Sequence, residues 1–173
     1  MDISNRSYVV IDLETSGIDK NCDYIIEVGA VKIVDGVICE RFSTLVNTPQ
    51  MTELPEEVEA LTGINFSDLQ SAPSVLTVLQ KLYDFANGCT FVAHNAPFDM
   101  AFLGNWGFWC GVDFYTATRG AIDTVNLAQE VLGDKVNNYG LSTLAEYFGI
   151  EFTHHCALGN AEASAKIFLE LAK

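Results

Sequence analysis

The chain has 173 residues, 49% of them apolar and 18% charged, which argues against a disordered chain and favours one compact domain over residues 1–173. Its 23 acidic and 9 basic residues give a net charge of -14, which opposes broad, non-specific binding along duplex nucleic acid. No apolar run approaches the length of a membrane span, and the first residues lack the pattern of a secretory signal, so we expect no membrane partner and a cytoplasmic location.

The cysteines are scattered along the sequence and include no C-x-x-C pair. They predict neither a disulfide framework nor a zinc site. We expect most of them to be small core residues. They are Cys22, Cys39, Cys89, Cys110 and Cys156.

Two acidic side chains follow the first predicted strand. The apolar run from Tyr8 to Ile11 is typical of a short buried strand, and Asp12 and Glu14 come next, two residues apart. On an extended chain this spacing points both carboxylates to the same face, where a cation relieves their repulsion. Hard divalent ions such as Mg²⁺ or Mn²⁺ are the usual guests of such oxygen ligands. The alternative is a strand that runs out into a solvated acidic turn.

The next two segments predict a hairpin. Residues 24–34 and 37–46 are rich in β-branched and apolar residues, and Asp35-Gly36 separates them. Together with the first strand they give three consecutive strands, expected to be antiparallel. Residues 49–59 carry turn signals and an acidic helix start, which we expect to be solvated.

Strands and helices alternate in the rest of the chain. Apolar spacing predicts a helix over 74–85, a short buried strand over 90–93, and a helix that starts near Pro97 and runs towards Trp106. A further strand at 121–122 is followed by helices over 124–132, 141–148 and 156–172. The order predicts an α/β fold whose mixed sheet has three antiparallel strands, then parallel strands, and helices on both faces.

Two further clusters could carry chemistry. The segment from His94 to Asp99 lies on the turn from a buried strand into a helix, where free N–H groups suit an anion such as phosphate. Asp99 falls in the first helical turn, so helix capping is the alternative for it. The segment from His154 to Glu162 leads into the last helix, and its histidines could equally be surface or capping residues.

In order and spacing these three segments resemble the motifs of the DnaQ-like 3′–5′ exonucleases of the DEDDh type. This family includes the proofreading exonuclease (epsilon) subunits of bacterial replicative DNA polymerases such as DNA polymerase III, and several RNA-trimming enzymes. Asp12 and Glu14 match its D-x-E motif, and Asp99 matches the Asp of its H-N-A-x-F-D segment. His155 matches the catalytic His, five residues before the final acid. Residues 46–49 and 61–64 also look like family segments, and the resemblance implies an RNase H-like fold.

The resemblance implies two-metal hydrolysis of phosphodiester bonds. In the family, two divalent ions about 4 Å apart clamp the scissile phosphate. Carried over, Asp12 would bridge both ions, Glu14 would hold the ion that activates water, and Asp99 would support the second. His155 would be the general base, although His154 could stand in for it.

One position departs from the family pattern, because Asn160 stands where the family has its fourth acid. An Asn keeps a carbonyl oxygen but loses a negative charge and offers an amide donor. We therefore expect a weakened metal position at Asn160 and impaired activity. Glu162 is expected to point to a different helical face and not to replace the acid. The sequence leaves open whether Asn160 is natural or engineered.

The resemblance also implies contacts with a strand end. The substrate would be the 3′ end of single-stranded DNA or RNA, and DNA is favoured; the product would be a nucleoside monophosphate, and a DNA polymerase subunit is a possible partner. Apolar side chains beside the acids could stack on terminal bases, although core packing is an equal alternative for Phe98. The substrate-binding candidates are Leu13, Thr15, His94, Asn95 and Phe98. The alternative functions are a silenced family member that binds nucleic-acid ends or a polymerase, and an α/β domain with no nucleic-acid role.

Overall fold

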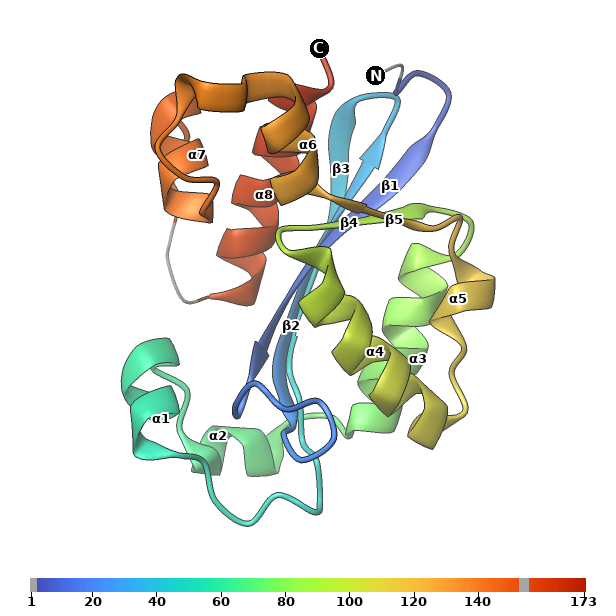
Figure 1. The fold of residues 1–173 in the computed structure, drawn as a ribbon. Coiled ribbons are helices and arrows are strands. Elements are labelled where there is room, and N and C mark those ends of the chain that lie inside the picture. The colour runs from blue at the N-terminus through green and yellow to red at the C-terminus, as the bar shows by residue number, and fades with distance from the viewer. Residues whose placement is uncertain (1–2, 153–155) are drawn as a thin grey trace.

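Five strands form one mixed sheet in the computed structural model, which describes residues 3–152 and 156–173 (Figure 1). The strand order is β3-β2-β1-β4-β5. β2 pairs antiparallel with β1 and β3, whereas β4 runs parallel to β1 and β5. This is the mixed sheet predicted from the sequence. The strands are β1 Ser7–Thr15, β2 Ile25–Val34, β3 Val37–Leu45, β4 Thr90–Ala93 and β5 Ala121–Asp123.

The hairpin between β2 and β3 turns at the predicted dipeptide. Asp35 and Gly36 both have positive φ, 51° and 76°, which is the requirement of a type I′ turn. That turn twists in the same sense as the strands on either side, so it favours their pairing. The hairpin prediction is confirmed.

β1 is longer than the sequence pattern predicted. It continues to Thr15, so Asp12 and Glu14 lie within the strand and not after it. β2 pairs along the whole of β1, but β4 pairs only with the stretch from Tyr8 to Val10. The stretch of β1 from Ile11 to Thr15 therefore has an open edge on the β4 side, where the chain turns away into a helix.

The helices agree closely with the apolar spacing. The predicted helices at 124–132 and 141–148 have those same bounds, and the other long helices differ by a few residues at their ends. The short helices α2 and α5 were not predicted, and every residue of the acidic helix α1 is at least partly exposed. The helices are α1 Glu56–Thr62, α2 Phe66–Ser71, α3 Val75–Ala86, α4 Ala96–Cys110, α5 Phe114–Ala117, α6 Thr124–Leu132, the 3₁₀ helix η1 Gly133–Lys135, α7 Leu141–Phe148 and α8 Ala157–Leu171.

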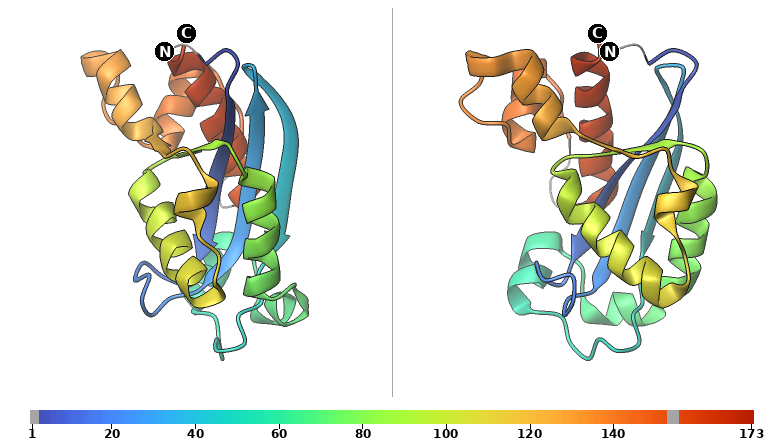
Figure 2. Two further views of the ribbon diagram at one scale, coloured as in Figure 1. Left: turned by 90° about the vertical axis from the view of Figure 1, so that its right-hand side faces the viewer. Right: turned by 45° about the vertical axis from the view of Figure 1, so that its right-hand side comes forward.

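The two faces of β1 belong to two different cores. Val9, Ile11 and Leu13 pack with α3 and α4, whereas Tyr8 and Val10 pack with α8, as the alternation of a strand requires. Figure 1 shows α6 to α8 gathered on one side of the strands and α3 to α5 on the other. Figure 2 shows α1 and α2 at the opposite end of the molecule from α6 and α7.

The prediction that most cysteines are core residues is wrong. Of the five cysteines only Cys89 is buried, while Cys22 and Cys39 are exposed and the other two are half-buried. The buried interior is filled by alanine and by larger aliphatic and aromatic side chains instead. Each cysteine is a free thiol. None of the helices in the described ranges is long and apolar enough to cross a membrane.

Candidate active site at the end of β1

Two carboxylates of β1 face the first turn of α8. Asp12 and Glu14 lie on the same face of the strand as Tyr8 and Val10, which pack against α8. In the pairing with β2, Asp12 lies opposite Gly29 and Glu14 lies opposite Glu27. The predicted common face for the two acids is therefore present, and α8 covers it.

Asp99 reaches the same end of β1 from the other layer. It lies in the first turn of α4 and is 3% exposed. Its Oδ1 accepts a hydrogen bond of 3.1 Å from the backbone N–H of Leu13. That N–H lies beyond the part of β1 that β4 pairs, so Asp99 satisfies a donor that the sheet leaves open. Its side chain thus reaches out of α4 to β1, and it also interacts with its own backbone N–H in the first helical turn.

Asn160 joins the two carboxylates of β1. Its Nδ2 donates to Oδ2 of Asp12 at 3.2 Å and to Oε1 of Glu14 at 3.4 Å. Asn160 is the fourth residue of α8, so the first turn of this helix carries the amide to the acids. The fold thus brings three distant segments of the sequence to one end of β1.

The acids repel one another at this point. The pKa of Asp12 is raised well above its usual value, first by burial and then by the charges of Asp99 and Glu14, although the hydrogen bond from Asn160 lowers it. Burial followed by the charge of Glu27 raises the pKa of Glu14 to about 7. Burial raises the pKa of Asp99 to about 8. Ionised carboxylates are therefore costly here unless a cation accompanies them.

The acidic side chains at the end of β1 are not arranged as a set of metal ligands. Within residues 3–152 and 156–173, no three His, Cys, Asp or Glu side chains are grouped so as to hold a metal. The amide group of Asn160 contacts both Asp12 and Glu14 as a neutral hydrogen-bond donor. The predicted general base His155 and its neighbour His154 lie outside the described residues.

The turn after β4 is organised by Asp123 and Thr124. Nδ1 of His94 lies 2.9 Å from Oγ1 of Thr124, and burial lowers the pKa of His94. Asn95 has a φ of 66°, and its N–H donates to Oδ1 of Asp123 at 3.0 Å. Both predicted substrate residues therefore have an internal contact, through the ring of His94 and the backbone of Asn95.

The other predicted substrate residues differ in accessibility. Leu13 is 5% exposed and belongs to the core on the α4 side of the sheet. Thr15 donates its hydroxyl to the carbonyl oxygen of Gly17 at 2.6 Å. Phe98 is half-buried, with its ring centroid 5.0 Å from that of Phe102. Phe98 also lines a hollow of about 400 Å³. The other residues that line this hollow are Ile18, Asp19, Lys20, Asn21, Ala101 and Phe102.

Sequence reasoning missed three residues that shape this region. Asp123 caps α6 and holds the turn at Asn95, and an Asp directly before a helical pattern is a signal that could have identified it. Glu27 and Gly29 lie in the middle of a strand pattern. Their role depends on which helix covers β2, and no local signal in the sequence carries that information.

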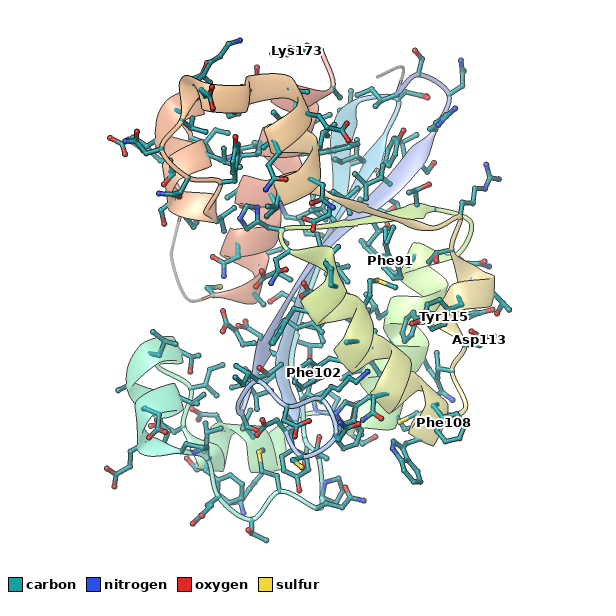
Figure 3. All side chains as sticks on the ribbon, in the orientation of Figure 1. Phe91, Phe102, Phe108, Asp113, Tyr115 and Lys173 are labelled. Atoms are coloured by element: carbon teal, nitrogen blue, oxygen red, sulfur yellow. The ribbon has the colours of Figure 1, made fainter. Side chains whose placement is uncertain are left out.

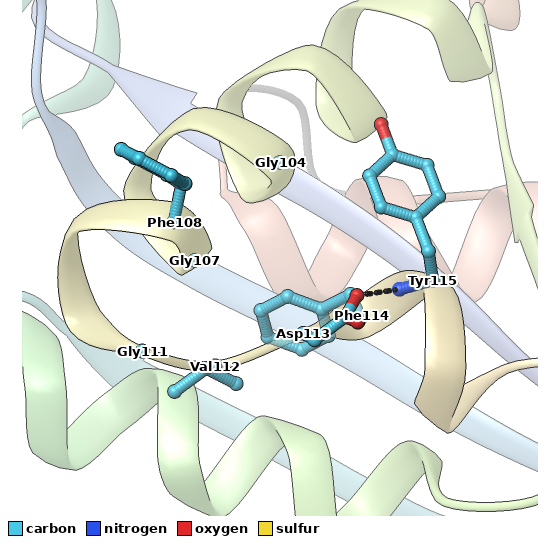
Figure 4. A pocket seen from close by; sticks show the side chains of 8 residues that line it. All are labelled: Gly104, Gly107, Phe108, Gly111, Val112, Asp113, Phe114 and Tyr115. Carbon is cyan, nitrogen blue, oxygen red and sulfur yellow. Dashed lines mark hydrogen bonds between the residues drawn. The ribbon is translucent and has the colours of Figure 1, made fainter.

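A second hollow lies at the other end of α4. It measures about 410 Å³ and lies between α4 and α5, where Figure 3 shows Phe108 and Tyr115 towards the surface. Its one carboxylate, Asp113, accepts a hydrogen bond of 3.0 Å from the N–H of Tyr115, as Figure 4 shows. A Cβ on Gly107 would lie 2.5 Å from the carbonyl oxygen of Val112. Gly107 thus allows the segment after α4 to pack closely on that helix, and Asp113 caps α5.

Known proteins match the chain over most of its length. The profile of the RNase T family, described as exonuclease, matches residues 9–168. A PolC-type DNA polymerase III from Caldanaerobacter subterraneus subsp. tengcongensis is 39% identical over 165 residues, which are 95% of this chain and 11% of that protein. The chain thus spans about a ninth of the length of that relative.

Solved structures show the same fold. Exonuclease X in complex with 5′-overhanging duplex DNA superposes with a TM-score of 0.72 at 22% identity, over 95% of this chain and 90% of that one. A zinc-bound complex of Escherichia coli exonuclease I with single-stranded DNA superposes with a TM-score of 0.81 at 15% identity, over 95% of this chain and 40% of that one. The RNase H-like fold expected from the resemblance is confirmed. With the family profile covering almost the whole sequence, the chain belongs to the DnaQ-like 3′–5′ exonuclease family.

Proposed function

We propose that this chain removes nucleotides from the 3′ end of single-stranded DNA with the help of divalent metal ions, and that Asn160 keeps its activity low. The observation that carries the proposal is the contact of the Asn160 amide with both Asp12 and Glu14, at 3.2 and 3.4 Å. An amide donor bridges two carboxylates at the position where the family's pattern has an acid. The sequence thereby replaces a metal-binding charge with a hydrogen-bond donor.

The chemistry of the donor set supports Mg²⁺ or Mn²⁺ as the cofactor. Asp12, Glu14 and Asp99 offer hard oxygen ligands, and burial raises the pKa of each, so a cation would favour their charged forms. These three acids would hold the metal, which in this family supplies charge neutralisation of the phosphate and an activated water. His155 is the residue that we assign as proton acceptor, on its spacing in the motif.

Asn160 can coordinate a cation only after its side-chain amide rotates. The side-chain nitrogen faces Asp12 and Glu14, and a rotation about the last side-chain bond would present the carbonyl oxygen instead. That rotation removes two hydrogen bonds and supplies a neutral ligand where an Asp would supply an anion. We therefore propose that binding of two ions is weaker here than in a chain with four acids, and that the rate falls with it.

The substrate end is assigned to the hollow beside Phe98. This hollow joins two apolar side chains, Ile18 and Phe98, to one cation, Lys20. Ile18 is 89% exposed, so it is free to lie against a base, and Lys20 suits a backbone phosphate. Because the net charge is -14, we propose a grip on one strand end and not along a duplex. The DNA-bound structures of exonucleases X and I support DNA over RNA, and the PolC-type relative supports a proofreading role beside a polymerase.

A reversion experiment tests the proposal. A 5′-labelled single-stranded DNA oligonucleotide is incubated with Mn²⁺ and either the parent chain or Asn160→Asp. We expect slow shortening by the parent and an increase of about 100-fold or more in the variant, since an anionic ligand dominates such electrostatics. Asn137→Asp, which adds the same charge at an exposed loop residue, is the control and should change little.

The silenced-relative alternative gives a different result. A chain that only binds ends would retain the oligonucleotide in a titration, yet neither the parent nor Asn160→Asp would shorten it. An unchanged rate in Asn160→Asp, with the variant folded and Mn²⁺ present, would refute the proposed role of Asn160. The same assay with an RNA oligonucleotide decides between the two nucleic acids, because the 2′-OH is the group that distinguishes them.

A further inference from the structure

Glu27 occupies an electrostatically unfavourable place in the sheet. It lies on β2 directly opposite Glu14, and like charges across an antiparallel pair are destabilising. Its charge also contributes to the raised pKa values of Glu14 and Asp12. A Gln or Thr at this strand position would avoid that repulsion, so the carboxylate needs a compensating interaction.

The compensating interaction is with the start of α8. Oε2 of Glu27 accepts a hydrogen bond of 3.0 Å from the backbone N–H of Ala157, the first residue of that helix. Within the described part of the chain, the N-cap residue Cys156 makes no side-chain capping bond. Glu27 therefore caps α8 from 130 residues away in the sequence, and its charge suits the positive end of the helix dipole.

Gly29 sets the depth of the same turn. A Cβ on Gly29 would lie 2.1 Å from the carbonyl carbon of Ala157 and 2.2 Å from the nitrogen of Leu158. The backbone of α8 thus rests directly on β2, at the residue that pairs with Asp12. Glu27 and Gly29 together fix where the helix begins, and Asn160 follows one helical turn later.

We propose that Glu27 is a positioning residue for the active site. It holds the first turn of α8 in place so that residue 160 contacts Asp12 and Glu14. The assignment builds on the proposed function, because it treats this meeting point as the metal position. Glu27 does not touch the reacting atoms. It acts through the Ala157 N–H, and the acceptor oxygen is the feature that matters.

The test separates the acceptor from the charge. Glu27→Ala removes both, whereas Glu27→Gln keeps an oxygen that can accept from Ala157. Glu40→Ala is the matched control, since Glu40 is an exposed acid on the neighbouring strand β3 whose ion pair is with Lys32. Each variant of the full chain is titrated with Mn²⁺ alone, followed by electron paramagnetic resonance, and is then assayed for kcat and KM on the oligonucleotide.

We expect Glu27→Ala to weaken Mn²⁺ binding by about 10- to 100-fold, as is typical when a ligand's support is lost, and to lower kcat more than it raises KM. Glu27→Gln should retain most of the affinity, and Glu40→Ala all of it. Parent-like affinity in a folded Glu27→Ala, or a Gln variant as damaged as the Ala variant, would overturn the assignment.

Hydrogen exchange of the parent chain gives an independent outcome. The Ala157 amide should exchange slowly, because Glu27 holds it, and fast exchange in a folded parent would also overturn the assignment. This measurement needs neither metal nor nucleic acid and applies even if Glu27→Ala fails to fold. A protein in which Ala157 is protected but Asn160→Asp shortens no oligonucleotide would refute the proposed function and leave the role of Glu27 standing.

Discussion

Nδ2 of Asn160 lies 3.2 Å from Oδ2 of Asp12, although 148 positions separate the two residues in the sequence. This contact joins the first strand to the last helix at the place where the acids of the site meet. It lowers the pKa of Asp12, against burial and the neighbouring charges that raise it. The amide therefore stabilises the protein without a cation.

Asn160→Asp should destabilise the metal-free chain. The substitution removes a donor from Asp12 and Glu14 and adds a further carboxylate beside them, so we expect a loss of about 1–3 kcal/mol. Excess Mn²⁺ should reverse the order and make the variant more stable than the parent. Thermal unfolding in EDTA and in MnCl₂ measures both effects. Equal melting temperatures in EDTA would show that the amide contact contributes nothing.

The raised pKa values predict that the metal-free chain loses stability as the pH rises. Unfolded Glu and Asp titrate near about 4.3 and 3.9, whereas Glu14 and Asp99 titrate at about 7 and about 8 in the folded chain. Between these values the folded chain binds more protons than the unfolded chain, so the free energy of unfolding falls with pH. The contribution of these two groups is complete below about pH 4 and is lost by about pH 8.

Urea unfolding at pH 5 and pH 8 in EDTA measures this dependence. Glu14→Gln should reduce the fall of the free energy of unfolding with pH, because it removes one of the two titrating groups. A saturating concentration of a divalent ion should reduce that fall further. A metal-free parent that is more stable at pH 8 than at pH 5, by an amount that Glu14→Gln leaves unchanged, would contradict the prediction.

Gly29→Ala should destabilise the fold and damage the site. Its Cβ would lie 2.1 Å from the backbone of Ala157, which cannot move aside as a side chain can. Overpacking of this kind costs about 1–3 kcal/mol or more and would push α8 away from β2. Gly140→Ala is the control, because the nearest atom there is Oδ1 of the Asn138 side chain at 3.1 Å. Chemical denaturation of both variants decides, and a Gly29→Ala as stable as the parent would be inconsistent with this packing.

Substitutions of Asn95 separate its backbone role from its predicted contact with substrate. Asn95 has a φ of 66°, so Asn95→Gly should keep the stability of the chain while Asn95→Ala loses about 1 kcal/mol. If the side chain binds a phosphate of the substrate, Asn95→Gly will raise KM for the oligonucleotide without unfolding. A KM that stays at the parent value in Asn95→Gly would remove Asn95 from the substrate-binding residues.

Local sequence patterns predicted the elements whose cause is local. The Asp35-Gly36 turn and the helices α6 and α7 follow from turn chemistry and apolar spacing alone. The helices α2 and α5 were missed because they have 6 and 4 residues, too few for a helical period to be visible. The extent of β1 was missed because two acids interrupt its apolar run, while pairing with β2 holds it extended to Thr15.

The site could be predicted only in part. The D-x-E spacing placed Asp12 and Glu14 on one face, as the structure has them. The bond from Leu13 to Asp99 depends on where β4 stops pairing, and the cap from Glu27 depends on which helix crosses β2. Both are products of the tertiary fold. The sequence around an acidic residue within a strand pattern indicates neither contact. The simplest prediction for such a residue is that its side chain is exposed to solvent.

The open edge of β1 allows the two helical layers to meet at one site. Asp99 reaches that edge from the layer of α3 and α4, whereas Asp12 and Glu14 face the layer of α8. An ion shared by all three would fasten the two helical layers to each other at one end of the sheet. Core substitutions that shift either layer at this end of the sheet should then change the affinity for the ion, at temperatures where the molecule is still folded.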